Sequence, residues 1–425
     1  MNMNQPQTSR KTQFLAGFNS YFAKIRLFRR NAWLYLIFTI LNGLTFGIYW
    51  LLFNFYILSL GFDEALLGQI LTITSLVALF SALPAGVVSD RIGRKPTMLL
   101  SSMATVTAVF GMVFWPTIPG FYTMSVLMGI SQSLAGVTFG PFLMENSGEE
   151  ERTYLFSFSF GMQMIASFAG NWFGGMLPTW VGIRLAVDAT SSLAYGRSMF
   201  IVACMGIAAI FPVLLIRRQR AAREEEDRLS PFQYARQHPA MLGKFIFPIL
   251  ITSLGAGLLI PFMNIFFRTT YNSSDSTIGT LFAASSLAMA VGLLLAPPLA
   301  DKMGKMRMVI LTQALSIPFL FMLGFAPWFW LSATAYLVRQ ALMNMSNPVY
   351  EAFVMENVDE EARATVASLT SMSWNFGWAF SPTISGKLQV AYGFGPVFAG
   401  TITLYVIAIF LYYRFFWHSA GPARA

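Results

Sequence analysis

The chain is too apolar for a soluble protein of its length. Of its 425 residues, 56% are apolar and 16% are aromatic, while only 11% are charged. The mean hydropathy is +0.58. This composition is typical of an integral membrane protein and argues against a soluble enzyme.

The residue types that build most catalytic and metal centres are scarce. One cysteine, Cys204, and two histidines, His238 and His418, are too few for a disulfide framework, a zinc site or a histidine-based triad. The sequence also lacks the Gly-x4-Gly-Lys-Ser/Thr loop that binds nucleotide phosphates. We therefore expect neither an enzyme nor an ATP-driven pump, and we expect no cofactor and no metal.

Long stretches without an ionisable side chain run along the chain, and a helix needs about 20 residues to cross the hydrocarbon core of a bilayer. These stretches are residues 31–62, 65–89, 96–144, 153–183, 198–216, 245–267, 276–300, 308–338, 364–386 and 388–413. Pro116 and Pro119 divide the longest stretch into two crossings. Pro327 separates another pair, of which the second contains Arg339. The sequence thus predicts an all-α membrane protein with twelve transmembrane helices.

The basic residues are distributed unevenly between the two predicted faces. Of 28 Lys and Arg residues, 23 lie in the amino-terminal segment, in the loops after even-numbered helices and in the carboxyl tail. The positive-inside rule then puts both termini and the central loop in the cytoplasm, in the plasma membrane or bacterial inner membrane. Residues 13–30 carry Phe14, Phe18 and Phe22 near helical spacing beside basic residues, which predicts an amphipathic anchor and not a signal peptide.

The sequence is an internal duplication. An offset of 211 residues aligns Gly68 with Gly279, Asp90 with Asp301 and, without a gap, the stretch at Met144 with that at Met355. Two parallel repeats of six helices follow, an arrangement found in secondary transporters. The predicted segments are an amphipathic amino-terminal segment 1–32, a first half 33–216, a cytoplasmic central loop 217–244, a second half 245–415 and a cytoplasmic tail 416–425.

The loop after the second predicted helix carries a recognisable motif. Residues 86–95 read Gly-Val-Val-Ser-Asp-Arg-Ile-Gly-Arg-Lys, and residues 301–305 form a degenerate second copy, with Pro297 where the first glycine would stand. This pattern resembles the signature loop of the major facilitator superfamily. The resemblance implies a secondary transporter that moves a small molecule by alternating access. Residues 170–175 and 381–386 resemble the Gly-Pro-x-x-Gly-Gly pattern of the family's exporters, although close helix packing explains such small residues equally well.

Charged residues recur at equivalent positions beside both copies of the motif. In the family such groups bridge neighbouring helices on the cytoplasmic side and favour the outward-facing state. The resemblance therefore implies a conformational latch, although these residues are also compatible with ordinary charged loops. The predicted latch residues are Asp90, Arg94, Glu145 and Arg152 in the first half, and Asp301, Lys305, Glu356 and Arg363 in the second.

Polar residues inside the predicted spans form stripes at helical spacing. Any one of them is explained by a hydrogen bond between helices, whereas a stripe that includes a carboxylate favours a cavity lining. The predicted lining consists of Asn42, Thr45 and Tyr49 in the first helix, Arg339, Gln340, Asn344, Asn347 and Glu351 in the tenth, and Ser371, Asn375 and Trp378 in the eleventh.

Glu351 is the predicted proton-coupling residue, because it is the only acidic residue inside a predicted span and away from the loop-end pairs. It lies roughly 7.5 Å inside the cytoplasmic boundary at 1.5 Å per residue, from where it can exchange protons with the cytoplasm. Arg339 lies roughly 18 Å further from that boundary, too far to pair with Glu351. Arg339 is therefore expected to pair with a different residue or with an anionic group of the substrate. In the family a comparable arginine belongs to the fourth helix, where this sequence has Met128.

The 41 Phe, 10 Trp and 24 Met residues suit an apolar or amphipathic substrate. The first hypothesis is proton-coupled export of a drug-like or amphipathic solute. Proton-linked or facilitated uptake of a metabolite such as a sugar is the alternative, and a membrane sensor without transport is a further one. The expected partners are the solute, a proton and the lipid bilayer, with no nucleic acid, and the protein is expected to be a monomer.

Overall fold

The computed structural model describes residues 26–217, 236–358 and 363–417, and all of the regular structure in them is helical. Most of the predicted amphipathic segment 13–30, of the central loop and of the carboxyl tail lies outside these ranges. The first six helices are α2 (Arg30–Ser59), α3 (Glu64–Ile92), α4 (Arg94–Phe114), α5 (Ile118–Glu145), α6 (Glu149–Leu185) and α7 (Ser192–Leu215).

The second set of helices begins with an interrupted one. It consists of α9 (Pro239–Leu259), the 3-10 turn η1 (Ile260–Phe262) and α10 (Met263–Tyr271), which follow one another directly. The remaining helices are α11 (Asp275–Met303), α12 (Lys305–Phe325), α13 (Phe329–Glu356), α14 (Arg363–Tyr392) and α15 (Phe394–Phe416). With α9, η1 and α10 taken as one, the described residues form the twelve predicted helices.

The helix ends follow from local sequence. Side-chain oxygens of Asp63, Ser191 and Ser274 accept hydrogen bonds from backbone N–H groups in the first turns of α3, α7 and α11. Gly93 and Gly304 separate α3 from α4 and α11 from α12 with φ of 93° and 86°, a backbone region that suits glycine. The two copies of the motif therefore make the same turn. Pro239 starts α9 inside the segment assigned to the central loop, because proline suits the first turn of a helix.

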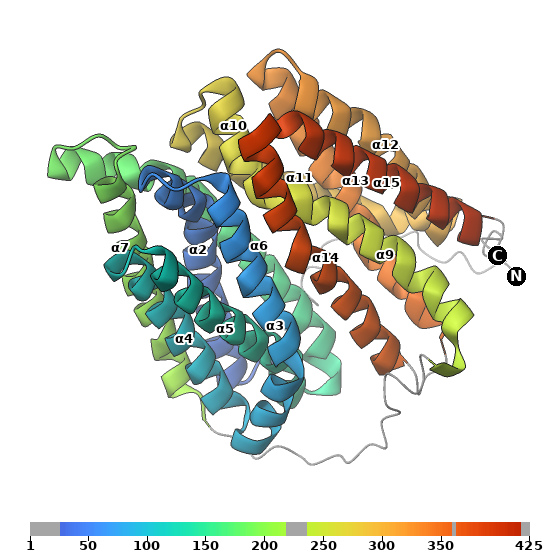
Figure 1. The fold of residues 1–425 in the computed structure, drawn as a ribbon. Helices are drawn as coiled ribbons and strands as arrows, with labels where there is room; N and C mark the ends of the chain where they lie inside the picture. Colours follow the sequence, from blue (N-terminus) through green and yellow to red (C-terminus); the bar gives the residue numbers. More distant parts are fainter. Residues whose placement is uncertain (1–25, 218–235, 359–362, 418–425) are drawn as a thin grey trace, which may run out of the picture.

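The helices form two groups that follow the duplication. Figure 1 shows α2 to α7 and α9 to α15 as two bundles beside each other. α3 packs against α14, and α6 packs against α11, so these four helices join the groups. We call the groups the first and the second half.

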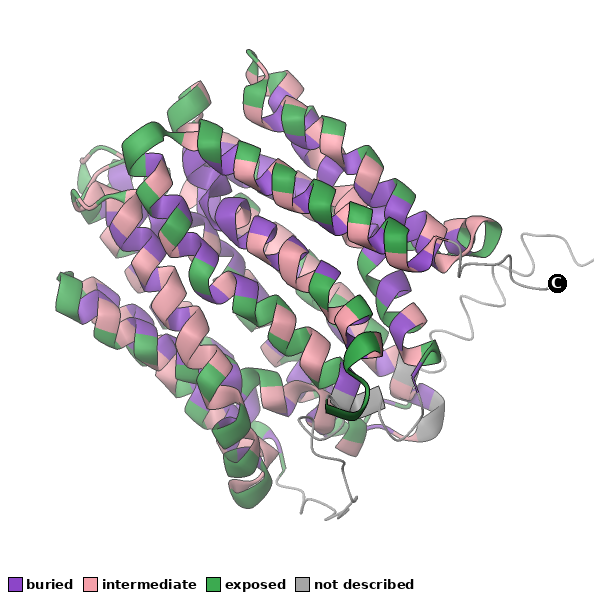
Figure 2. Cartoon of the chain, turned by 45° about the vertical axis from the view of Figure 1, so that its right-hand side comes forward, coloured by how far each residue is buried: buried purple, intermediate pink, exposed green. Residues whose placement is uncertain are grey.

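Nine of the helices in the described residues are long and apolar enough to cross a membrane. The apolar surface is exposed, as expected for contact with lipid: Phe80, Leu294 and Trp330 are 76%, 77% and 78% exposed. Most helices carry buried, half-buried and exposed positions along their length (Figure 2). The remaining three, α6, α13 and α14, carry more polar residues.

The two ends of the bundle differ. One end carries the turns at residues 60–63, 186–191, 272–274 and 393, and we call it the sealed end, because side chains of the two halves are joined there. The other end carries the motif turns at Gly93 and Gly304 and the ends of α5 and α13, and we call it the motif end.

Candidate functional site

Each half contains a cavity. The cavity of the first half has a volume of about 670 Å³ and that of the second half about 620 Å³, sizes in the range of about 300 to 1,000 Å³ that small-molecule sites occupy. Ile260 lines the second cavity and the adjacent Pro261 lines the first. The two cavities therefore approach each other at η1.

The lining of the first cavity is polar and aromatic and, among the described residues, includes no Asp, Glu, Lys, Arg or His. The predicted residues Asn42, Thr45 and Tyr49 of α2 line it, and so does Trp378 of α14, from the second half. The rings of Trp50 and Trp378 lie 6.3 Å apart across the two halves. Further aromatic side chains in its wall are Phe38, Phe46, Phe139 and Phe160.

The second cavity contains the predicted stripe of α13. Its lining includes Arg339, Gln340, Asn344, Asn347 and Glu351, together with Ser371 of α14. Asn375 of α14 is exposed and lines neither cavity. The eleven residues predicted to form one lining thus divide into four in the first cavity, six in the second and one in neither.

The structure adds lining residues that the stripes did not indicate. In the first cavity the polar ones from α4, α5 and α6 include Ser101, Thr105, Ser131, Gln132 and Gln163, and α3 adds Thr74 and Ser75. Ser102 in the first cavity and Gln313 in the second are related by the offset of 211 residues, as are Gln163 and Trp374. The offset does not relate these four positions to any residue of the predicted stripes. Applied to the stripes, it would have found Ala256 and Ile260 of the second cavity from Thr45 and Tyr49.

Arg339 is 2% exposed and lines the second cavity. Its Nη2 donates a hydrogen bond to the hydroxyl of Tyr405 at 3.2 Å, and its Cζ lies 5.5 Å from the centre of that ring. Its Nε is buried and has no hydrogen-bond partner in the described residues. A charge at the centre of a membrane helix costs about 2.5 to 3.5 kcal/mol on insertion scales, so a single tyrosine hydroxyl is a weak compensation.

Glu351 is exposed to the second cavity and forms no ion pair with another described residue. Gln340 donates a hydrogen bond to the Tyr336 hydroxyl at 3.3 Å, and Asn344 donates one to the carbonyl of Gln340 at 2.9 Å. The side-chain amides of Gln340 and Asn344 therefore already donate hydrogen bonds within α13, whereas the Glu351 carboxylate is exposed to the cavity.

Charged residues at the motif end pair within the first half. Arg94 lies 2.7 Å from Oδ1 of Asp90 and 3.0 Å from Oε1 of Glu145. It also donates a hydrogen bond to Ser89 at 2.8 Å. One guanidinium thereby joins the end of α3, the start of α4 and the end of α5.

The second copy of this cluster is incomplete. Lys305 pairs with Glu356 and joins α12 to α13, while Asp301 is exposed and has no ion pair within the described ranges. The Nε of Arg152 is buried without a hydrogen-bond partner there. The side chain of Arg363 lies outside the described part of the structure.

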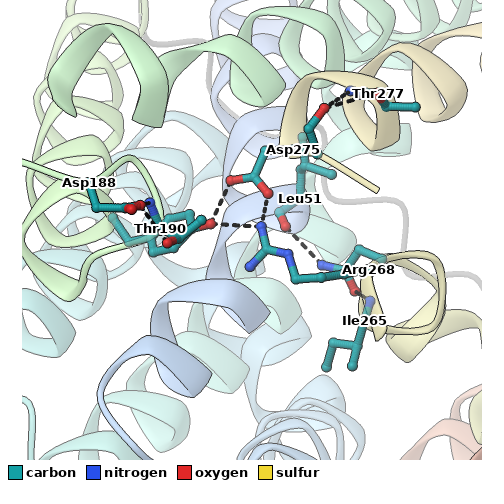
Figure 3. Close-up of polar contacts among 10 residues, drawn as sticks. Leu51, Asp188, Thr190, Ile265, Arg268, Asp275 and Thr277 are labelled. Carbon is teal, nitrogen blue, oxygen red and sulfur yellow. Dashed lines mark hydrogen bonds and ion pairs between the residues drawn. The ribbon is translucent and has the colours of Figure 1, made fainter. Parts of the chain in front are cut away.

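The halves are joined at the sealed end by a network around Arg268 and Asp275, which form an ion pair between α10 and the start of α11 (Figure 3). Tyr195 of α7 donates a hydrogen bond to Oδ2 of Asp275 at 2.6 Å and accepts one from Arg268 at 2.7 Å. The Arg268 guanidinium carbon lies 3.3 Å from the centre of the Phe55 ring of α2. Two helices of the first half thus hold a charge pair of the second.

Two asparagines form another link at this end. Asn54 of α2 donates hydrogen bonds to the carbonyl of Pro261 at 2.6 Å and to Oδ1 of Asn264 at 2.8 Å. Asn264 donates one to the carbonyl of Leu51 at 2.8 Å. Both amides are buried, so the link closes the bundle next to η1.

Glycines permit the close crossings between the halves. A Cβ on Gly175 of α6 would lie 2.5 Å from the carbonyl oxygen of Asp275 and 3.1 Å from Cα of Gly279. At the equivalent crossing, Gly68 of α3 meets the backbone of Pro382, and Gly386 of α14 meets that of Glu64. Close packing therefore accounts for Gly175 and Gly386.

The fold and cavities are those of a membrane transporter, and comparison with known proteins identifies the family. The family model described as Major Facilitator Superfamily matches residues 35–256 and 245–425. The chain belongs to this superfamily. It is therefore a multi-pass membrane protein of a transporter family and not an enzyme.

Its relatives of known sequence are distant. The chain is 22% identical to the tetracycline resistance protein, class G, of Vibrio anguillarum over 317 residues, which are 72% of this chain and 77% of the relative. It is 22% identical to the multi-drug resistance efflux pump PmrA of Streptococcus pneumoniae over 246 residues, or 56% of this chain and 58% of that pump.

Solved structures share the fold. The nucleoside transporter NupG has a TM-score of 0.74 at 16% identity, with 92% of this chain and all of that chain covered. A bacterial homologue of the human lysosomal transporter Spinster, in an inward-facing and unoccupied conformation, has a TM-score of 0.75 at 14% identity, with 93% of this chain and 99% of that chain covered.

Proposed function

We propose that the protein exports a small amphipathic or drug-like solute by alternating access, driven by protons. The observation that carries this proposal is the pair of cavities, one in each half, that approach each other at η1. A solute bound between two halves that rock about one site is the general mechanism of such transporters. The multi-drug resistance efflux pump PmrA among the relatives supports the direction of transport.

The walls of the first cavity favour an amphipathic solute. Polar residues such as Gln132 and Gln163 alternate there with the rings of Phe46 and Trp50, which can stack on a flat apolar body. A polar lining without aromatic walls would favour the alternative, uptake of a metabolite such as a sugar. The solute is the only partner required besides the proton and lipid, and a monomer suffices.

The orientation follows from the basic residues. With the motif end in the cytoplasm, both termini are cytoplasmic, and the sealed end faces outside across a bacterial inner membrane. The structure then corresponds to an inward-facing state. The Arg94 cluster is formed in this state and lies within the first half, so its formation alone does not mark the outward-facing state. The halves are the units that move. Their predicted bounds are 33–216 and 245–415 around the central loop 217–244, and α9 extends the second half back to Pro239.

Glu351 is the proposed coupling residue, because it is the acidic side chain of the second cavity and no described cation pairs with it. A carboxyl that takes a proton from one side and releases it on the other links solute movement to the proton gradient. Glu351→Gln keeps the size of the side chain but cannot titrate.

Transport by the purified protein in proteoliposomes tests this function. Tetracycline serves as the solute and glucose as the metabolite control, each with and without an imposed pH difference. Wild-type protein should concentrate tetracycline only with the pH difference, and Glu351→Gln should keep downhill exchange but lose accumulation. Glu64→Gln, the same change at the start of α3 and outside both cavities, should behave as wild type. Accumulation by Glu351→Gln, or accumulation of glucose alone, would contradict the proposal.

A further inference from the structure

We propose that the second cavity binds an organic anion and that Arg339 holds its carboxylate or equivalent acidic group. The inference rests on the proposed transport function and adds the class of the substrate. The site assigned to the anion consists of Arg339, Tyr405 and the adjoining wall of the cavity.

Arg339 is a buried cation without a counter-ion among the described residues. Its side chain is 2% exposed, and the hydroxyl of Tyr405 is its one hydrogen-bond partner among the described residues. The carboxylate in the same cavity, Glu351, follows 12 residues later on α13, roughly 18 Å away at 1.5 Å per residue. A buried charge is normally paired, so an anion from outside the chain completes this site.

The planar guanidinium of Arg339 suits a carboxylate, although its Nε is covered by protein atoms in this conformation. Its Nε has no hydrogen-bond partner in the described structure, while Nη2 is engaged by Tyr405. Planar guanidinium groups bind carboxylates through two parallel N–H donors, which gives direction as well as charge. Because the Tyr405 oxygen accepts from Arg339, its own hydrogen remains as a further donor to the anion.

Part of the remaining wall suits an apolar body on this anion, beside the polar stripe of α13. Ile249, Ala256, Ile260, Met343 and Trp374 line the same cavity, and its volume of about 620 Å³ admits a small organic molecule. The repeat-equivalent residue of Arg339 is Met128, which lines the uncharged first cavity. The acidic group of a solute that spans both cavities therefore enters the second one, and its neutral part occupies the first.

Thermal unfolding of the purified full chain in detergent tests the assignment. The probes are two matched pairs, naphthoate with naphthamide and octanoate with octanamide, and inorganic phosphate is a separate arm. Dissociation constants follow from the dependence of the unfolding temperature on ligand concentration. We expect the carboxylates to stabilise the protein, and the amides and phosphate to do so at least about 10-fold more weakly, since hydrogen bonds to charged groups are the stronger ones.

Variants identify the residue responsible. Arg339→Gln should weaken carboxylate binding at least about 10-fold and leave amide binding unchanged, and Arg339→Lys should be intermediate because it keeps the charge without the planar fork. Arg307→Gln is the matched control, because Arg307 lies in α12 outside the cavity and also has an Nε without a described partner.

Equal binding of acid and amide by wild-type protein, no stabilisation by either carboxylate, or an equal effect of phosphate would overturn the assignment. So would unchanged carboxylate binding by Arg339→Gln. The wild-type comparison decides even if that variant does not fold. Failure of the proposed transport function has a different signature: selective, Arg339-dependent binding of naphthoate without movement of naphthoate or tetracycline in proteoliposomes.

Discussion

The hydroxyl of Tyr195 lies 2.6 Å from Oδ2 of Asp275 and joins the first half of the protein to the second. The hydroxyl oxygen of Tyr195 also accepts a hydrogen bond from Arg268 at 2.7 Å. One phenol is therefore a partner of both members of an ion pair. Alternating access requires the two halves to separate at the sealed end in the state that opens to that side of the membrane. The link must then break in each cycle.

Tyr195→Phe removes this link and leaves the Arg268–Asp275 pair in place. Because hydrogen bonds to charged groups contribute about 1.5 to 3 kcal/mol, we expect the equilibrium to shift about 10- to 100-fold toward the state that is open at the sealed end. The ring itself remains, so packing around Phe55 is preserved.

Double electron–electron resonance, which measures the distance between two spin labels, can detect this shift in the conformational equilibrium. Spin labels at Ser192 of α7 and Thr280 of α11, both exposed, in a Cys204→Ser background should show a larger population of long distances in Tyr195→Phe. Tyr271→Phe is the control, because the Tyr271 hydroxyl bonds the carbonyl of Ala326 within the second half. Identical distributions in both variants would remove Tyr195 from the sealing contacts.

Gly175→Ala should prevent the close crossing of α6 and α11. The added Cβ would lie 2.5 Å from the backbone carbonyl of Asp275, which cannot rotate away as a side chain would. We expect destabilisation by about 1 to 3 kcal/mol, the range of overpacked cores, together with reduced transport. Thermal unfolding in detergent gives the first quantity and proteoliposome uptake the second.

Gly161→Ala on the same helix is the matched control. A Cβ at Gly161 would have no heavy atom within 4 Å, and alanine favours a helix over glycine by up to about 1 kcal/mol. This variant should be as stable as wild type or more so. If Gly175→Ala is equally well tolerated, the halves do not depend on this glycine for their contact.

Much of the fold could be predicted from the sequence, because the duplication is exact in register. The offset that aligns Gly93 with Gly304 also gives both residues a positive φ. The breaks at Pro116 and Pro327 fall between helices as predicted. Proline removes a backbone hydrogen-bond donor and so favours a break, but Pro84 and Pro382 lie inside α3 and α14, so proline alone does not end a helix here. The uncharged stretches that predicted the helices required no tertiary information.

The contacts between the halves could not be predicted in this way. The offset aligned Gly68 with Gly279, but nothing in it indicated that Gly279 meets Gly175 across the interface. Likewise, a stripe on one helix shows which residues share a face and not which cavity that face lines. Asn375 therefore entered the predicted lining, and Gln163 of α6 was left out of it.

The proposed orientation predicts which end reacts with an impermeant thiol reagent in whole cells. In a Cys204→Ser background, a cysteine at Ser273, in the turn between α10 and α11, should react from outside, and one at Lys302, at the end of α11, should not. The uneven distribution of basic residues is the reason. The opposite pattern of labelling would reverse the membrane orientation, and with it the interpretation of the structure as inward-facing.

The two copies of the charged cluster predict unequal effects of the same substitution. Asp90 pairs with Arg94 at 2.7 Å in a cluster that includes Glu145, whereas Asp301 has no ion pair in the described part of the chain. Asp90→Asn should therefore slow transport more than Asp301→Asn. Both variants should stay folded, because the Asp90 side chain is 69% exposed and exposed pairs contribute only about 0 to 1 kcal/mol.

Initial rates of tetracycline transport in proteoliposomes, beside thermal unfolding of the same preparations, separate these effects. A slower rate at an unchanged unfolding temperature assigns Asp90 to the conformational cycle, since a core residue would lower both. Glu145→Gln should act in the same direction, because it removes the second carboxylate around Arg94. Should Asp90→Asn and Asp301→Asn both transport at the wild-type rate, the cluster is an ordinary set of charged loop residues that marks the cytoplasmic face, and no latch exists there.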